Sequence, residues 1–226
     1  MTKKIRYPAI AGQFYPENKT KLTRQVNQLI NQAPLGKTPG QLQAIIAPHA
    51  SYNLSGPVSG VAYRLVKDQW QDKNHIFLIS SSHRYPLQTP TLASFDVWQT
   101  PLGEVKIDNC LKNLDINDEV HLFEHSLEIQ LPFLQTVLPK FSLTPVLLNE
   151  YDQEFAQQLA EVLTKKDALV ISSDLSHYYN YDRAIDLDKQ AHQVIQNLDF
   201  QAAKKIEACG LPAILTLIKI AQIKKW

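Results

Sequence analysis

The sequence is poor in cysteine, with two among its 226 residues. Two thiols cannot build the disulfide framework of a small secreted domain, so we expect a cytoplasmic protein in a reducing setting. Long apolar runs are also missing: no stretch reaches the roughly 18 residues of a membrane span, so we expect no membrane partner. The residues Met1 to Lys4 lead into no apolar run, which predicts no signal peptide.

An excess of charge of one sign is missing as well. The chain has 23 lysines and arginines against 22 acidic residues, a formal net charge of +1. Nucleic-acid binders need a strong basic excess or a basic stripe, so the sequence predicts no nucleic-acid partner. Apolar residues make up 44% of the chain, enough for a sizeable core. The length fits one α/β domain, and we expect a single domain over residues 1–226.

Three apolar runs are each followed closely by a histidine. The runs and the polar residues behind them are 44–47 with His49, 75–80 with His83, and 168–172 with Asp174 and His177. Short runs of this kind are typical of buried strands. In open α/β sheets, ligands bind at the carboxyl ends of the strands. We therefore expect these polar side chains to converge on one site.

Amphipathic stretches alternate with the apolar runs, which predicts a three-layer αβα fold with helices flanking a central, mostly parallel or mixed sheet. Residues 44–80 are predicted to form a βαβ unit whose two strands pair in parallel. Pro132 is expected to kink its helix, and Cys110 is expected to fill the core from a short helix. We expect helices over 21–31, 58–67, 107–114, 124–134, 153–163, 182–198, 200–208 and a last one to Lys224, and strands over 44–47, 75–80, 91–98, 142–148 and 168–172.

The polar residues at the predicted strand ends are of types that bind metals. Imidazole nitrogens suit iron, copper and zinc, and a thiolate adds a soft ligand. His49 and His83 are the candidate imidazole ligands. The anionic ligand is Cys209, Asp174 or Glu124, and spacing does not choose among them. Two histidines and one anionic ligand leave positions open to substrate, as in the non-haem iron oxygenases.

Each candidate also has a structural interpretation. A histidine at a strand end often only hydrogen-bonds to its neighbours. Glu124 and His125 can cap a helix, since glutamate is favoured near a helix start. Asp174 can cap the turn that contains His177, and Cys209 can be a buried thiol beneath the last helix. Three histidine-bearing strand ends in one chain favour the functional interpretation.

A set of motifs in this chain resembles the signatures of the Memo family. The motifs are Tyr7–Pro16, Ala47–Ala50, Ser81–His83, Thr100–Gly103, Glu124–Glu128, Ser172–His177 and Ala208–Gly210. Any one alone is unspecific, but the ordered set, which runs from the start of the chain to Gly210, is specific. The resemblance implies a fold similar to the catalytic subunit of class III extradiol dioxygenases, which hold non-haem Fe(II).

The same resemblance implies roles for five residues. His49, His83 and Cys209 match the metal-binding positions of the family, and Asp174 and His177 match a second polar pair with a catalytic role. Fe(II) is the implied metal, with copper or zinc as alternatives, because a thiolate replaces the carboxylate ligand of the dioxygenases. A small-molecule or peptide ligand in the pocket is also implied. For bacterial and archaeal members, so is a functional link to radical-SAM and AMMECR-type proteins.

The chain departs from the family pattern in two places. Ser51 stands where the family has glycine and Leu54 where it has an aromatic residue, both in the loop after His49. Family members also continue through a helix to a final strand. Because this chain ends at Trp226, we expect its C-terminus to be short relative to the family.

The leading hypothesis is a Memo-like metal-binding protein with redox or dioxygenase-like activity on an unknown substrate. In this hypothesis His177 acts as acid or base, Asp174 orients it, and Tyr15 and Tyr52 line the entrance. One alternative is a non-enzymatic module that binds a peptide or partner protein in the same pocket. Another is a zinc hydrolase that uses a metal-bound hydroxide.

Overall fold

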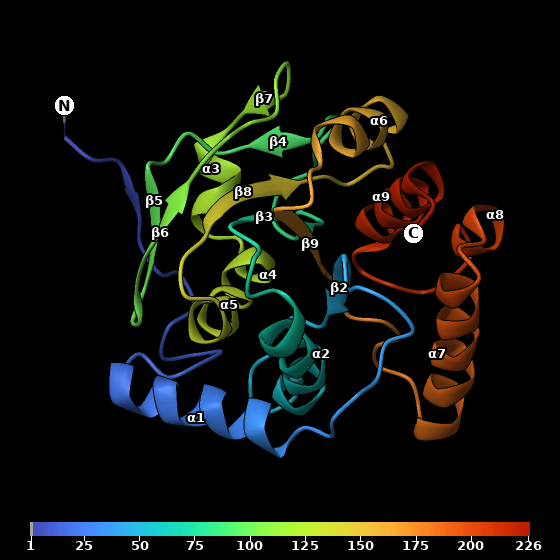
Figure 1. Cartoon of the computed structure of the whole chain (residues 1–226), viewed down its shortest axis with the longest axis horizontal. Helices are drawn as coiled ribbons and strands as arrows, with labels where there is room; N and C mark the ends of the chain where they lie inside the picture. Colours follow the sequence, from blue (N-terminus) through green and yellow to red (C-terminus); the bar gives the residue numbers. More distant parts are fainter. Residues whose placement is uncertain (1) are drawn as a thin grey trace.

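A mixed, mostly parallel β-sheet forms the centre of the structure, a computed structural model that describes residues 2–226. Its strands are β1 (Ile5–Arg6), β2 (Ala44–Ala47), β3 (His75–Ser80), β4 (Thr91–Leu92), β5 (Val97–Thr100), β6 (Gly103–Ile107), β7 (Asp115–Ile116), β8 (Ser142–Leu147) and β9 (Asp167–Ser172). They are arranged in the order β1-β5-β6-β8-β3-β9-β2, and β4 lies between β7 and β8 (Figure 1). The pairs β5–β6 and β4–β8 are antiparallel, and the other pairs are parallel.

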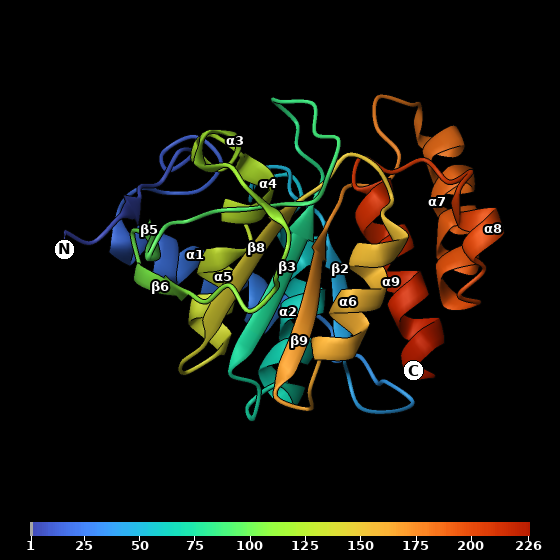
Figure 2. The same ribbon diagram turned by 90° about the horizontal axis from the view of Figure 1, so that it is seen from above.

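Helices cover both faces of this sheet. They are α1 (Lys19–Gln32), α2 (Gly56–Gln69), α3 (Asp118–Leu122), α4 (His125–Glu128), α5 (Leu131–Val137), α6 (Gln153–Val162), α7 (Tyr181–Gln196), α8 (Phe200–Ala203) and α9 (Leu211–Lys224). Helices α1, α2 and α5 lie on one side, and α6 and α9 lie on the other (Figure 2). Each side has its own hydrophobic core. The predicted three-layer αβα fold with a mixed, mostly parallel sheet is therefore confirmed.

The three strands that carry the site lie side by side, because β9 pairs with both β2 and β3. Ser172 of β9 is level with Ala47 of β2 on one side and with Ser80 of β3 on the other. All six residues of β3 are buried, which explains why its sequence is a continuous apolar run rather than an alternating one. The residues that follow these strands therefore lie close together, at the carboxyl ends of β2, β9 and β3.

Several local predictions were wrong. Strands β2 and β3 are parallel but do not pair with each other, because β9, from much later in the chain, lies between them. The predicted strand over 91–98 is two short strands, β4 and β5. In place of the predicted helix over 107–114, β6 ends at Ile107 and a loop leads to β7, which begins at Asp115. Val105 and Ile107 are buried alternately with exposed neighbours, so a period of two governs this stretch, and Cys110 is exposed rather than in the core.

Proline divides the predicted helix over 124–134 into α4 and α5. Pro132 stands in the first turn of α5, where its missing N–H costs no hydrogen bond. Glu124 precedes α4 and accepts a hydrogen bond from Ser126 N, so the predicted cap is present. The break between the two helices leaves Gln130 buried beside the strand ends.

The N-terminal segment is held to the body by a buried ion pair. Arg6 and Glu128 are both fully buried and directly paired. Glu128 also accepts hydrogen bonds from Ala9 N, Ile10 N and the Tyr15 hydroxyl. Tyr15 and Tyr52 are buried, with 3% and 2% of their surface exposed. The Tyr52 hydroxyl donates to Ile129 O. Both tyrosines are therefore core residues, and their predicted place at the entrance was wrong.

A buried histidine should make the protein sensitive to acid. His121 is fully buried; its Nε2 lies 3.1 Å from Thr91 O, and its Nδ1 has no hydrogen-bond partner among the described residues. Burial lowers the pKa of His121 to about 4. Because this value lies below that of the unfolded chain, the stability that neutral His121 supports is complete above about pH 6.5 and is lost as the pH falls toward 4.

Urea unfolding at pH 7.5 and 4.5 measures this effect. The free energy of unfolding of the wild type should fall between these two pH values. In His121→Gln, whose amide can still donate to Thr91 O, this fall should be smaller by roughly 2 to 3 kcal/mol. The exposed His192 provides the control His192→Gln, which should leave the loss unchanged. Equal acid sensitivity of wild type and His121→Gln would contradict the prediction.

None of the helices within residues 2–226 combines the length and the apolar character that crossing a membrane requires.

Candidate metal centre

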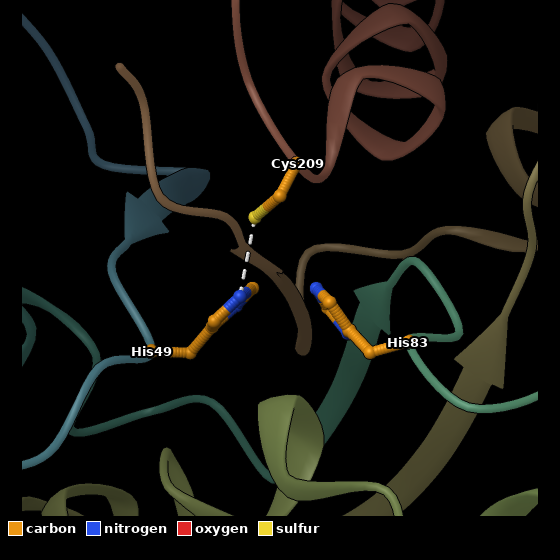
Figure 3. A group of neighbouring side chains, drawn as sticks. All are labelled: His49, His83 and Cys209. Carbon is orange, nitrogen blue, oxygen red and sulfur yellow. Dashed lines mark hydrogen bonds between the residues drawn. The ribbon is translucent and has the colours of Figure 1, made fainter. Parts of the chain in front are cut away.

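His49 follows β2, and Ser172 on the neighbouring strand β9 sets the orientation of its ring. Ser172 Oγ donates its single proton to Ser126 O at 2.6 Å, so it accepts from His49 Nδ1 at 3.1 Å. Nδ1 therefore carries a proton, and Nε2 faces Cys209 Sγ at 3.2 Å (Figure 3). A second partner on the far nitrogen is the usual way in which a ligating histidine is oriented.

His83 follows β3 and is oriented by Glu124. The Glu124 carboxylate accepts from His83 N at 2.8 Å and from His83 Nδ1 at 3.1 Å. The Nε2 atom of His83 is thereby directed toward His49 and Cys209 (Figure 3). Glu124 is fully buried, but its hydrogen bonds from His125 and His83 outweigh this burial and hold its pKa well below the usual range. A buried carboxylate behind an imidazole is typical of metal-ligating histidines.

Cys209 reaches the site from the turn before α9. Its backbone N–H donates to Asp174 O, and Asp174 N donates to Cys209 Sγ, each at 3.2 Å. Gly210 allows the close approach: a Cβ at this position would lie 2.6 Å from Ser173 Cβ and 2.9 Å from Ser172 O. Gly210 N also donates to Ser173 Oγ at 2.9 Å. The turn is thus tied to the end of β9 on both sides of the thiol.

These three side chains form a coupled acid–base set. Burial opposes ionisation of Cys209, but its hydrogen bonds with His49 and His83 lower its pKa to about 5. Burial also opposes the charged form of His83, yet its hydrogen bonds with Cys209 and Glu124 raise its pKa to about 10. The lowered pKa of Cys209 favours its thiolate at neutral pH. A thiolate is the form of cysteine that binds metals.

The donor set fits a metal ion. One nitrogen each of His49 and His83 and the sulfur of Cys209 all lie within 4.8 Å of one another. Two imidazoles and a thiolate suit iron, copper or zinc rather than magnesium or calcium. Three protein ligands leave at least one position of a tetrahedral ion free, as catalytic sites do. The structure thus brings together all three predicted ligands, although their binding of a metal stays a prediction.

A third imidazole lies beside the two candidate ligands. The ring of His125 is 4.8 Å from that of His83 and 5.3 Å from that of His49, measured between centroids. Its Nδ1 lies 3.2 Å from Glu124 Oε1. His83, Glu124 and His125 also form a second group of ligand atoms within 4.8 Å of one another. Because Glu124 orients both rings, we assign it to their support rather than to the first set of ligands.

The predicted catalytic pair lies next to the three candidate ligands. Asp174 Oδ1 accepts from His49 N at 2.7 Å, and its Oδ2 lies 3.5 Å from His177 Nε2. Oδ2 is also 3.9 Å from His49 Nε2. Asp174 thus connects the two histidines. The His177 side chain is 32% exposed and lines a groove of about 790 Å³, so it is open to a ligand from solvent.

Two residues of the site were missed by sequence reasoning. In the sequence, Ser172 ends a predicted strand and begins the motif Ser172–His177, and Gln130 lies inside a predicted helix. In the structure, Gln130 Nε2 donates to Ser172 Oγ at 2.8 Å and to Pro48 O at 2.9 Å. Both residues are buried and hold the His49 loop against β9. A polar residue inside an otherwise apolar stretch was the only signal in the sequence.

Comparison with known proteins agrees with the family that the motifs indicate. Residues 6–225 match the family model described as Memo-like protein. A MEMO1 family protein of Aquifex aeolicus is 32% identical, covering 97% of this chain and 87% of the relative. MEMO1 family proteins of Sulfolobus acidocaldarius and Archaeoglobus fulgidus are each 30% identical, over 96% and 97% of this chain and 88% of each relative. The chain therefore belongs to the Memo-like protein family.

Proposed function

We propose that this protein binds a single transition-metal ion through His49, His83 and Cys209 and uses it in redox chemistry on a small ligand. The observation that carries the proposal is the convergence of two oriented imidazoles and one acidic thiol within 4.8 Å. These groups come from three separate places in the sequence. Fe(II) is the leading candidate and copper or zinc the alternatives, because imidazole and thiolate ligands suit all three.

The bound metal would supply a redox-active Lewis acid with a position open to oxygen or a chelating substrate. The protein's own residues would do the rest. Glu124 and Ser172 hold the two imidazoles in place from their far nitrogens. His177 would move a proton at its Nε2, which faces Asp174 Oδ2 at 3.5 Å. Asp174 would keep that ring oriented toward the ligand.

Metal analysis after anaerobic purification is the direct test. We expect close to one iron or copper per chain, and oxygen uptake when catechols or other chelating phenols are added. Tight metal without turnover would favour the alternative of a pocket that only binds a peptide or partner protein. Hydrolytic activity that persists with zinc and without oxygen would favour a zinc hydrolase. Absence of stoichiometric metal would overturn the proposal.

Gly210→Ala should weaken metal binding while both histidines stay in place. The added Cβ would lie 2.6 Å from Ser173 Cβ, so the turn that carries Cys209 must move away from β9. We expect metal affinity, measured by competition with a coloured chelator, to fall at least about tenfold, as it does when the support of a ligand is lost. Gly40→Ala is the matched control, since nothing lies within 4 Å of a Cβ there. Equal affinity of the two variants would contradict this account of Gly210.

A further inference from the structure

A hydrogen-bonded serine and histidine lie at the opposite end of the sheet from the candidate metal centre. His75 is the first residue of β3 and Ser142 the first of β8, and the two are level in the parallel pairing of these strands (Figure 2). Ser142 Oγ lies 2.7 Å from His75 Nδ1. Because β3 runs from His75 toward the loop that carries His83, the full length of the strand separates this pair from the metal centre.

A threonine on β8 determines where the protons of this pair lie. Thr144 Oγ1 donates its proton to Asp108 O, so it accepts from His75 Nε2 at 3.0 Å. The Cys110 thiol is farther from the same nitrogen, at 3.8 Å. Nε2 therefore carries a proton, which leaves Nδ1 to accept the hydroxyl proton of Ser142. A hydroxyl that donates to an imidazole held by a third group is the arrangement of an activated serine nucleophile.

Burial keeps this imidazole in the form that can accept a proton. His75 is 8% exposed, and burial lowers its pKa below the ordinary value, although the charges of Asp167 and Asp108 oppose this shift. His75 is therefore neutral at pH 7. Ser142 is only half-buried, so its oxygen is accessible from solvent. A neutral base beside an accessible hydroxyl is what attack on a substrate requires.

The contact between the two side chains is not needed to join the strands. Their backbones are already connected, because Ser142 N donates to Asn74 O at 2.9 Å and Asn74 N donates to Lys166 O at 3.0 Å. Water can satisfy a half-buried hydroxyl equally well. The side-chain contact thus goes beyond what strand pairing requires.

A cavity of about 780 Å³ opens beside the serine and the histidine, and both residues line it. Its volume lies in the range of small-molecule sites. The lining also includes three apolar and three basic side chains, which are Phe77, Phe141, Val162, Lys106, Lys140 and Lys166. A ligand with both an apolar and an anionic part would suit such a lining.

The charges of the lining favour an anion. Asp108 and Asp167 are its two acidic residues. Lys106 lies 4.0 Å from the Asp108 carboxylate and pairs with it, which leaves Lys140 and Lys166 against Asp167. The lining therefore has a net positive charge, which attracts a negatively charged group to the cavity.

We propose that this cavity hydrolyses small carboxylic esters that carry an apolar part and an anionic group. Ser142 Oγ would attack the carbonyl carbon while its proton passes to His75 Nδ1, and His75 would return that proton to the oxygen of the departing alcohol. A water molecule that loses a proton to His75 would then cleave the acyl ester of Ser142, releasing the acid and the free serine. Asn74 and Lys140 line the cavity and carry N–H donors for the oxyanion.

A fluorophosphonate probe tests the proposal on the full chain, with a chelator present because this chemistry does not depend on the proposed metal. We expect covalent labelling of Ser142, mapped by mass spectrometry, and hydrolysis of the para-nitrophenyl monoester of glutaric acid. Ser142→Ala should abolish both, and His75→Gln should slow both at least about 100-fold. Thr144→Val should slow labelling and Thr144→Ser should restore it. Lys166→Gln should lower kcat/KM for the glutarate ester but not for neutral para-nitrophenyl butyrate.

Matched variants separate this site from general reactivity and from the metal centre. Ser94 is exposed and its hydroxyl donates to a carboxylate, so Ser94→Ala should leave labelling unchanged. His49→Ala should keep the ester hydrolysis, which a metal-dependent hydrolase would lose. Absence of labelling at Ser142, or equal labelling of the wild type and His75→Gln, would overturn the proposal. So would ester hydrolysis that survives in Ser142→Ala.

Discussion

Replacing either candidate imidazole ligand with alanine should abolish stoichiometric metal binding. His49→Ala and His83→Ala each remove a nitrogen donor and leave two ligands. With two ligands the metal should dissociate when the protein is diluted. The expected loss of affinity is at least about 100-fold, more than the 10- to 100-fold that loss of a supporting residue causes. Cys209→Ser should lose affinity as well, because a hydroxyl is a much poorer ligand than a thiolate. Metal content by mass spectrometry of the folded variants measures each effect.

His177→Ala is the informative control for these variants. His177 lies 3.5 Å from Asp174 but outside the set of three ligand atoms, so metal content should be retained while any turnover is lost. Full metal occupancy in His49→Ala would refute the assignment of ligands. Loss of metal in His177→Ala would instead place this histidine in the coordination set.

Breaking the buried ion pair should have the largest effect on stability. Arg6 is fully buried, stacks on the Trp98 ring at 4.5 Å, and donates to His121 O and Glu124 O at 2.9 Å. In Glu128→Gln the guanidinium stays buried without its counter-charge, which costs about 3 to 5 kcal/mol. Urea or thermal unfolding followed by circular dichroism measures the loss.

An exposed ion pair provides the control for this variant. Lys3 and Glu104 are paired at the surface, with side chains 48% and 41% exposed. Glu104→Gln should cost less than about 1 kcal/mol, because solvent screens an exposed pair. A small effect of Glu128→Gln would show that the hydrogen bonds from Ala9, Ile10 and Tyr15, rather than the charge, hold the N-terminal segment.

Much of the fold was predictable because local patterns and burial agree. Runs such as Ile76 to Ile79 are continuous and apolar, and helices on both faces of the sheet bury them completely. The pattern misled where a strand is short and half-exposed: Ile107 and Leu111 have helical spacing, yet Ile107 ends β6. Pairing with β5 and β8 outweighed the local preference there.

The sequence by itself determined the classes of group at the site, since His49 and His83 follow apolar runs that are typical of buried strands, and the carboxyl ends of such strands lie together in a parallel sheet. It could not choose among Cys209, Asp174 and Glu124 as the anionic member. Only the tertiary structure places the Cys209 thiol at the two imidazoles, through the insertion of β9 between β2 and β3 and the close approach of Gly210 to Ser173. The same packing directs Glu124 to the far side of His83. Such long-range contacts depend on the order of strands, which no local pattern encodes.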